Sequence, residues 1–259
     1  MATLATSLGI IGYCEQGSGG VPLVFLHGVG SDKFAWDPQL AHFGKKRRTI
    51  AFDYPGYGES DLLVERSGNP HDQLAEAIIA AFDALSLDRV HVCGLSLGGV
   101  VAISIADRTP ERFASLTIAD SFARHPDGPA IVERSIAAST DMAALAKARV
   151  PHLLAVPADE KLAEGLVGTM SNIDPTAFRF ASRAVWLADQ RKRAESMSLP
   201  ALILCGERDL ITPPILSHEL AGLIDDSRVE LIASAGHLPN LEQPAAFDRA
   251  LNQFLSGSR

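Results

Sequence analysis

Short runs of apolar residues recur along the chain and predict buried strands. They lie at residues 21–26, 49–53, 90–93, 115–119, 200–205 and 228–232. Because these runs are short and rich in apolar or β-branched residues, they are typical of strands that are buried on both faces of a parallel sheet. Apolar residues at helical spacing occur between several of the runs and near the end of the chain, at residues 73–87, 97–107, 215–223 and 244–255. This alternation predicts an α/β fold with a mostly parallel central sheet flanked by helices.

The alternation of strands and helices is interrupted once, between Asp120 and Leu199. This segment has helical patterns but no convincing strand, and its charges are mixed, so no single-sign patch identifies a partner. A chain of 259 residues is long for one domain, but α/β folds reach this size around a single core. We therefore expect one domain whose core, residues 1–120 and 200–259, is interrupted by a helical insertion at 121–199.

Composition indicates a well-packed globular protein that does not bind nucleic acid. Apolar residues make up 47% of the chain, charged residues 21%, and the formal net charge is −8. Nucleic-acid-binding proteins concentrate Lys and Arg on one face, whereas the basic run at residues 45–48 directly precedes a predicted strand. No stretch reaches the ~18 apolar residues of a membrane span, and the first residues lack the pattern of a signal peptide. We expect a cytoplasmic protein without a nucleic-acid or membrane partner, and a homo-oligomer is left open.

The three cysteines are expected to be small packing residues without a chemical role. Cys93 and Cys205 lie inside predicted strands, and together with Cys14 they make an odd number that cannot pair completely within the chain. Small buried cysteines are typical of proteins from a reducing compartment. We therefore expect neither a disulfide nor a metal site.

The strongest chemical signal is the segment GLSLGG at residues 94–99, which follows a predicted strand and opens a predicted helix. A serine on such a tight strand-to-helix turn is a nucleophile elbow, and the turn needs small residues because it is strained and closely packed. The main alternative is a dinucleotide-binding turn, but Ser96 stands where the G-x-G-x-x-G pattern needs its second glycine. The segment therefore predicts that Ser96 is a nucleophile.

A serine nucleophile needs a histidine base and a carboxylate that holds the imidazole in the right tautomer. His237 follows the last predicted strand in the segment SAGHLPN, so a loop can place it over the carboxyl edge of the sheet. Asp209 follows another predicted strand in the segment CGERD, and we prefer it as the acid. Asp120 is its rival, because the carboxyl ends of neighbouring strands open onto one crevice. The chain order serine, aspartate, histidine is the one that accompanies a nucleophile elbow.

An oxyanion formed at Ser96 needs backbone N–H donors that are already oriented. One donor is expected from Leu97, the residue after the nucleophile. The segment HGVG at residues 27–30 follows another predicted strand, and we assign Val29 as the second donor. His27 is expected to fix this loop by hydrogen bonding and not to act in catalysis.

Taken together, these motifs resemble the α/β-hydrolase superfamily. The segments that carry the resemblance are HGVG at 27–30, DYPGYGES at 53–60, GLSLGG at 94–99, GERDLITPP at 206–214 and AGHLPNLEQP at 235–244. The resemblance runs over nearly the whole chain in the right order, and residues 237–255 look like the branch of 3-oxoadipate enol-lactonases and small carboxylesterases. It implies the α/β-hydrolase fold, with the insertion at 121–199 as a helical cap over the site.

The resemblance implies a serine hydrolase that cleaves carboxylic esters through an acyl-enzyme on Ser96, with no metal or organic cofactor. A small-molecule ester or lactone would be its partner, and a 3-oxoadipate enol-lactonase or another lactonase is the alternative. The same triad would also serve a C–C bond hydrolase or a cofactor-free perhydrolase. Some hormone receptors also keep this fold, so a non-catalytic ligand receptor is a further alternative.

Three residues are candidates for substrate binding, namely Trp36, Arg134 and Trp186. Enol-lactonases usually carry a tryptophan near an arginine on the first cap helix, whereas residues 130–134 retain only the arginine. A buried carboxylate without a well-placed cation pays a large desolvation penalty. We therefore expect short uncharged acyl esters to be cleaved better than an enol-lactone with a free carboxylate.

Overall fold

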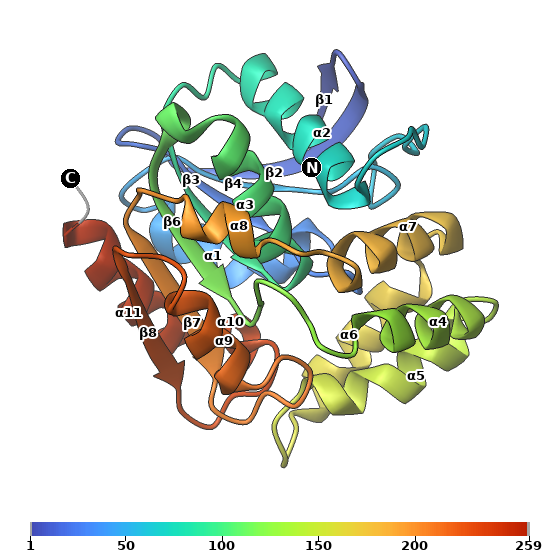
Figure 1. Cartoon of the computed structure of the whole chain (residues 1–259). Helices are drawn as coiled ribbons and strands as arrows, with labels where there is room; N and C mark the ends of the chain where they lie inside the picture. Colours follow the sequence, from blue (N-terminus) through green and yellow to red (C-terminus); the bar gives the residue numbers. More distant parts are fainter. Residues whose placement is uncertain (1, 258–259) are drawn as a thin grey trace.

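The central feature of the fold is a twisted sheet with the strand order β1-β2-β4-β3-β5-β6-β7-β8, seen in the computed structural model of the chain, which describes residues 2–257 (Figure 1). Neighbouring strands from β3 and β4 to β8 pair in parallel. These strands are β3 (Leu23–Leu26), β4 (Thr49–Phe52), β5 (Val90–Leu95), β6 (Phe113–Ala119), β7 (Ala201–Gly206) and β8 (Ser227–Ile232). The predicted runs therefore correspond to strands, although β8 at the edge of the sheet is mostly half-buried or exposed and not buried on both faces. The predicted α/β fold with a mostly parallel sheet is confirmed.

Two strands at one edge of the sheet were not predicted. β1 (Ala2–Thr6) and β2 (Gly9–Gln16) form an antiparallel hairpin, and β2 also pairs with β4. β1 is exposed or half-buried at every position, and only part of β2 is buried. Such edge strands have no continuous apolar run, so the criterion that identifies buried parallel strands does not detect them.

Helices cover both faces of the sheet (Figure 1). On one face α2 (Pro70–Ala84) packs against α3 (Leu97–Arg108), and on the other α1 (Asp37–Phe43) packs against α11 (Pro244–Gly257). α9 (Pro214–Ala221) lies against β7 and β8. A short helix, α10 (Pro239–Glu242), follows β8, and two 3-10 turns, η1 (Lys33–Trp36) and η2 (Pro110–Arg112), complete the core.

The segment between β6 and β7 is helical throughout its regular part; its helices α4 to α7 lie together at one end of the sheet, and α8 packs on α3 of the core (Figure 1). Its helices are α4 (Gly128–Ala138), α5 (Met142–Leu153), α6 (Glu160–Ser171), α7 (Pro175–Trp186) and α8 (Arg191–Glu195). α5 packs against α6 and α4 against α7, while α7 also contacts α2 of the core. Aspartate side chains accept hydrogen bonds from the first-turn N–H groups of α5, α6 and α7, which fixes where these helices begin.

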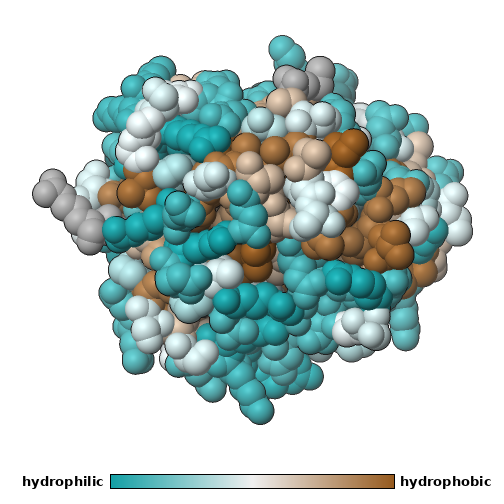
Figure 2. Space-filling model, turned by 90° about the horizontal axis from the view of Figure 1, so that it is seen from above, coloured by the Kyte–Doolittle hydropathy of each residue, from teal (hydrophilic) through white to brown (hydrophobic). Residues whose placement is uncertain are grey.

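The surface mixes polar and apolar residues. On the face seen from above, hydrophobic residues form a band between hydrophilic regions (Figure 2). Among the described residues, the most exposed large apolar side chains include those of Val64, Val156, Leu210 and Ile215. Within residues 2–257, no helix combines the length and apolar character that a membrane crossing requires.

Candidate active site

Ser96, the predicted nucleophile, lies between the end of β5 and the start of α3. Its backbone has φ 55° and ψ −113°, a strained conformation for a residue with a side chain. A side chain at Gly94 would collide with the carbonyl of Gly98, and one at Gly98 would collide with the carbonyl of Leu26. The glycines of this segment are therefore required by the close approach of β5, α3 and β3, as expected for an elbow.

His237 and Asp209, the predicted base and acid, lie in direct contact. The Nδ1 atom of His237 is 2.8 Å from Oδ2 of Asp209, and both side chains are buried. The other oxygen of Asp209 accepts hydrogen bonds from the N–H groups of Ile211 and Thr212, and the Thr212 hydroxyl donates to Oδ2 at 2.6 Å. Burial opposes ionisation of Asp209, but His237 and these donors hold its pKa well below the ordinary range. The carboxylate therefore stays charged beside the imidazole.

The loop that carries His237 is attached to the helical segment. The N–H of His237 donates to the carbonyl of Leu153, at the end of α5. The carboxylate of Glu242 accepts from the N–H groups of Gly236 and Leu238, which flank the histidine, and from Ala155 beyond α5. Sequence reasoning missed Glu242, although its position five residues after His237 in the segment HLPNLE was a signal that α10 turns back on this loop.

Asp120, the rival acid, has a different environment. It lies at the end of β6 with φ 45°, and its Oδ1 accepts from the N–H of Gly206 at 2.8 Å. Its Oδ2 is buried without a hydrogen-bond partner in the described part of the chain. Burial, together with the nearby Asp209 carboxylate, raises the pKa of Asp120 well above the ordinary range. Burial and the charge of Asp209 therefore favour the protonated form of Asp120, and no hydrogen bond or ion pair joins it to His237 among the described residues.

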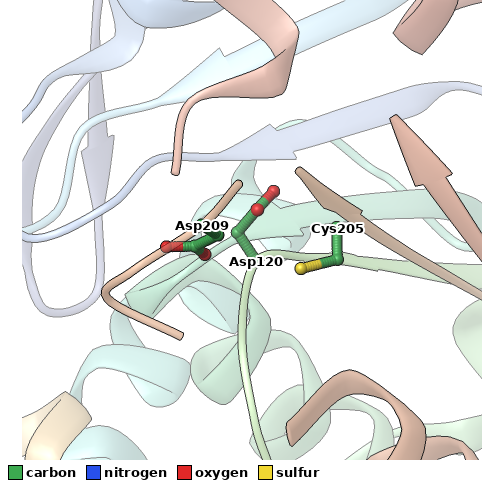
Figure 3. A group of neighbouring side chains, drawn as sticks. All are labelled: Asp120, Cys205 and Asp209. Atoms are coloured by element: carbon green, nitrogen blue, oxygen red, sulfur yellow. The ribbon is translucent and has the colours of Figure 1, made fainter. Parts of the chain in front are cut away.

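Asp120, Cys205 and Asp209 form a compact buried cluster, with one potential ligand atom of each within 4.8 Å of the others. Figure 3 shows Asp120 between the other two side chains. Metal ions bind deprotonated thiolates and carboxylates. Here burial raises the pKa of the Cys205 thiol, which donates to the carbonyls of Gly206 and Thr212, and Asp209 is already engaged by His237. A protonated thiol and an already engaged carboxylate are poor metal ligands. The chemistry of this cluster is therefore better suited to surrounding Asp209, the predicted acid, than to binding a metal ion.

The loop that carries Val29, the predicted oxyanion donor, is fixed by hydrogen bonds that involve Tyr57 and His27. The hydroxyl of Tyr57 donates to the Val29 carbonyl at 2.8 Å. His27 bonds to the carbonyl of Gly28 through Nδ1, and its Nε2 accepts from the N–H of Tyr54, so Nδ1 carries the proton. Leu97 is the first residue of α3, where an N–H has no acceptor within the helix. Both predicted donors thus lie at backbone positions beside Ser96.

The segment 53–60 supports this loop through a buried ion pair. Lys33 of η1 is completely buried, and its Nζ contacts Asp53 and Glu59, each at 2.5 Å. The N–H of Lys33 also donates to Asp53 at 2.8 Å. Tyr57 belongs to the same segment and bonds to the Val29 carbonyl. The ion pair of Lys33 therefore helps to hold the Val29 loop in place.

A small cavity, which we call the catalytic cavity, brings the predicted residues together. Its volume is about 20 Å³, and Val29, Ser96 and His237 line it. Two larger cavities adjoin it through shared wall residues. The acidic cavity, of about 680 Å³, shares Ser31 and Leu166 with it. The arginine cavity, of about 550 Å³, shares Arg149.

The predicted substrate-binding residues are separated in space. Trp36 is completely buried in the core, where it stacks on Phe25 with ring centroids 4.7 Å apart and also contacts Phe247. It lines none of the three cavities described here, so the prediction that it binds substrate is corrected: its side chain packs α1 and η1 onto the sheet. Arg134 and Trp186 both line the arginine cavity, and neither lines the catalytic cavity.

Comparison with known proteins identifies the class to which this fold and site belong. Residues 23–250 match the model of the alpha/beta hydrolase family. Since this match spans most of the chain, the protein is a member of the alpha/beta hydrolase family.

The named relatives of the chain include enol-lactonases and methyl ester esterases. The chain is 28% identical over 237 residues to 3-oxoadipate enol-lactonase 1 of Acinetobacter baylyi, covering 90% of this chain and 88% of the relative. It is 29% identical over 248 residues to a pimeloyl-[acyl-carrier protein] methyl ester esterase of Neisseria meningitidis, covering 90% and 92%. Among solved structures, the enol-lactonase from Burkholderia xenovorans superposes with a TM-score of 0.90 at 26% identity, covering 98% of this chain and 100% of that one.

Proposed function

We propose that the protein is a serine hydrolase that cleaves carboxylic esters through an acyl-enzyme on Ser96. The observation that carries this proposal is the contact of 2.8 Å between Asp209 and His237, because His237 and Ser96 line the same cavity. The named relatives include an enol-lactonase and a methyl ester esterase, and these names describe hydrolysis of a cyclic and an open carboxylic ester.

The proposed chemistry gives each of these side chains a role. His237 accepts the proton of Ser96 as the oxygen attacks the ester carbonyl, and the N–H groups of Val29 and Leu97 stabilise the oxyanion. His237 then gives the proton to the departing alcohol, and water clears the acyl group by the same route. Asp209 keeps Nδ1 of His237 protonated, which leaves Nε2 free to act as base.

Hydrolysis of p-nitrophenyl butyrate tests the proposal. We expect ordinary enzymatic turnover by the wild type and loss of at least three orders of magnitude in kcat for Ser96→Ala, because the nucleophile alone is removed. The matched control is Ser256→Ala, an exposed serine of α11, which should behave as wild type. A fluorophosphonate should label Ser96 and abolish activity.

Lactone hydrolysis is the second candidate, favoured by the enol-lactonases among the relatives and solved structures. The same acyl-enzyme would open a cyclic ester, with the alcohol remaining attached to the acyl chain. Absence of turnover with both p-nitrophenyl butyrate and 3-oxoadipate enol-lactone, in folded protein, would instead favour a ligand receptor that retains the triad.

A further inference from the structure

Arg149 of α5 is a half-buried arginine in the wall of the catalytic cavity, which Ser96 and His237 also line. Among residues 2–257, its guanidinium has neither a hydrogen bond nor an ion pair. The group that acts on it electrostatically is the hydroxyl of Tyr57, which already donates to the Val29 carbonyl. Burial lowers the pKa of Arg149, but a guanidinium stays protonated at neutral pH.

An unpaired cation at this depth is costly for the protein. The catalytic cavity therefore contains a positive charge that the fold itself does not neutralise. A ligand anion would satisfy it, and the planar guanidinium is suited to bind a carboxylate with two parallel hydrogen bonds.

The arginine cavity provides room for such a ligand beyond Arg149. Its walls combine apolar side chains with a second guanidinium, that of Arg134 on α4, which also lacks a partner in the described chain. Asp127 is the one carboxylate in its lining, and it is exposed. His125 lies in the same wall, where burial lowers its pKa, so it contributes no positive charge at neutral pH. An apolar chain that ends in an anion fits this lining.

The cavity on the other side of the site has the opposite charge. Asp32, Asp159 and Glu242 line the acidic cavity, against a single cation, Lys161. An anionic group placed there would meet carboxylates, whereas one placed beside Arg149 would meet guanidinium groups. The two cavities therefore distinguish the two ends of a substrate by charge.

We propose that Arg149 binds a carboxylate of the substrate, so that the protein hydrolyses esters that carry a free carboxylate on the part held in the arginine cavity. This inference rests on the proposed ester hydrolysis at Ser96. It revises the expectation that uncharged esters are preferred, because that expectation considered Arg134 as the anion partner and did not include Arg149. The neutral part of the substrate lies toward the acidic cavity.

Two pairs of esters of matched shape test the proposal. In the first pair the acyl part differs, with monomethyl adipate compared with its neutral amide, methyl 5-carbamoylpentanoate. In the second pair the alcohol part differs, with the butyrate ester of 4-hydroxybutanoate compared with that of 4-hydroxybutanamide. We expect kcat/KM to be at least tenfold higher for the carboxylate in one of the pairs, which corresponds to about 1.4 kcal/mol.

Variants assign the effect to Arg149. The ratio of carboxylate to amide should fall to within about threefold of one for Arg149→Gln, and Arg149→Lys should retain part of it. The control is Lys147→Gln, which removes a positive charge from an exposed position on the same helix and should keep the wild-type ratio. If Lys147→Gln lowers the ratio of carboxylate to amide kcat/KM as much as Arg149→Gln does, the assignment to Arg149 is overturned.

Binding measurements keep the test independent of turnover and of the folding of the variants. By calorimetry, wild-type protein should bind adipate at least ten times more tightly than adipamide. Equal binding, together with ratios near one in both ester pairs, would overturn the role of Arg149 while leaving ester hydrolysis intact. Loss of p-nitrophenyl butyrate turnover in the wild type would instead contradict the proposed function, and tight adipate binding would still support the anion site.

Discussion

The pKa values of two aspartates that follow adjacent strands are shifted in opposite directions in this protein. Asp209 is buried but receives three hydrogen-bond donors and the imidazole of His237, which hold its pKa low. Asp120 is buried with one donor, beside that same charge, and its pKa is raised. Two carboxyl groups this close cannot both ionise readily, so the one with more donors keeps the charge.

Asparagine substitutions should separate these roles. Asp209→Asn removes the negative charge that stabilises the imidazolium, and a loss of roughly 10⁴-fold in kcat has precedent in an unrelated serine protease. Asp120→Asn keeps the acceptor for the N–H of Gly206 and removes no charge, so kcat should fall by less than roughly tenfold, about 1.4 kcal/mol. Steady-state kinetics with p-nitrophenyl butyrate provide the comparison. If Asp120→Asn is the more damaging change, the acid lies after β6 instead.

At the scale of elements, the position of His237 depends on how α5, β8 and α10 meet. The histidine lies on the loop between β8 and α10, and its N–H is held by the end of α5. Glu242 at the end of α10 connects the same loop to the backbone beyond α5. The core and the helical segment between β6 and β7 therefore jointly position His237, the predicted base.

Glu242→Ala should lower kcat by more than tenfold and leave KM within about threefold, because three N–H donors lose their acceptor and the loop of His237 loosens. Hydrogen bonds to a charged group contribute about 1.5–3 kcal/mol each, so the free energy of unfolding should fall by at least roughly 2 kcal/mol. Glu242→Gln keeps an acceptor and should restore most of kcat. The control is Glu219→Ala, an exposed glutamate of α9. A fall in stability with unchanged kcat would show that Glu242 does not position the base.

At the scale of the whole molecule, several buried histidines couple folding to pH. Burial, with Arg47 and Arg89 nearby, lowers the pKa of His91 to about 4. Burial also lowers the pKa of His27 to about 4. In an unfolded chain a histidine has a pKa of about 6.5, so between these values the unfolded state binds protons that the folded state excludes. These histidines therefore make the fold less stable as the pH falls from about 6.5 toward 4.

His91 offers the cleanest test, since it lies at the start of β5 and far along the strand from the elbow. From pH 7 to pH 5, it should account for roughly 2 kcal/mol of the loss in unfolding free energy, at about 1.4 kcal/mol per pKa unit. Urea denaturation at both pH values should show a smaller loss for His91→Asn than for the wild type. His218→Asn, at an exposed position of α9, should keep the wild-type loss. If all three proteins lose the same unfolding free energy between pH 7 and pH 5, His91 does not cause the pH dependence of stability.

Local sequence determined the features that depend on neighbours along the chain. Continuous apolar runs specify strands buried on both faces, and the glycines around Ser96 specify a turn that admits no side chains. The elbow and the loops of Asp209 and His237 follow directly after strands, so their placement at one edge of the sheet could be predicted from chain order. The hairpin of β1 and β2 could not, because glycines and polar residues interrupt the apolar positions of its strands.

Tertiary structure alone decided which side chains line the cavities around Ser96. Trp36 looked like a binding residue but fills the core, while Arg149, in a helical segment without any motif, lines the cavity beside Ser96. Whether a residue on α5 points to solvent or to Ser96 depends on how α5 packs on α6 and against the loop of His237. That packing is a contact between segments far apart in the sequence, so helical periodicity does not specify it. The same reason explains why the charge difference between the two large cavities became visible only in the folded chain.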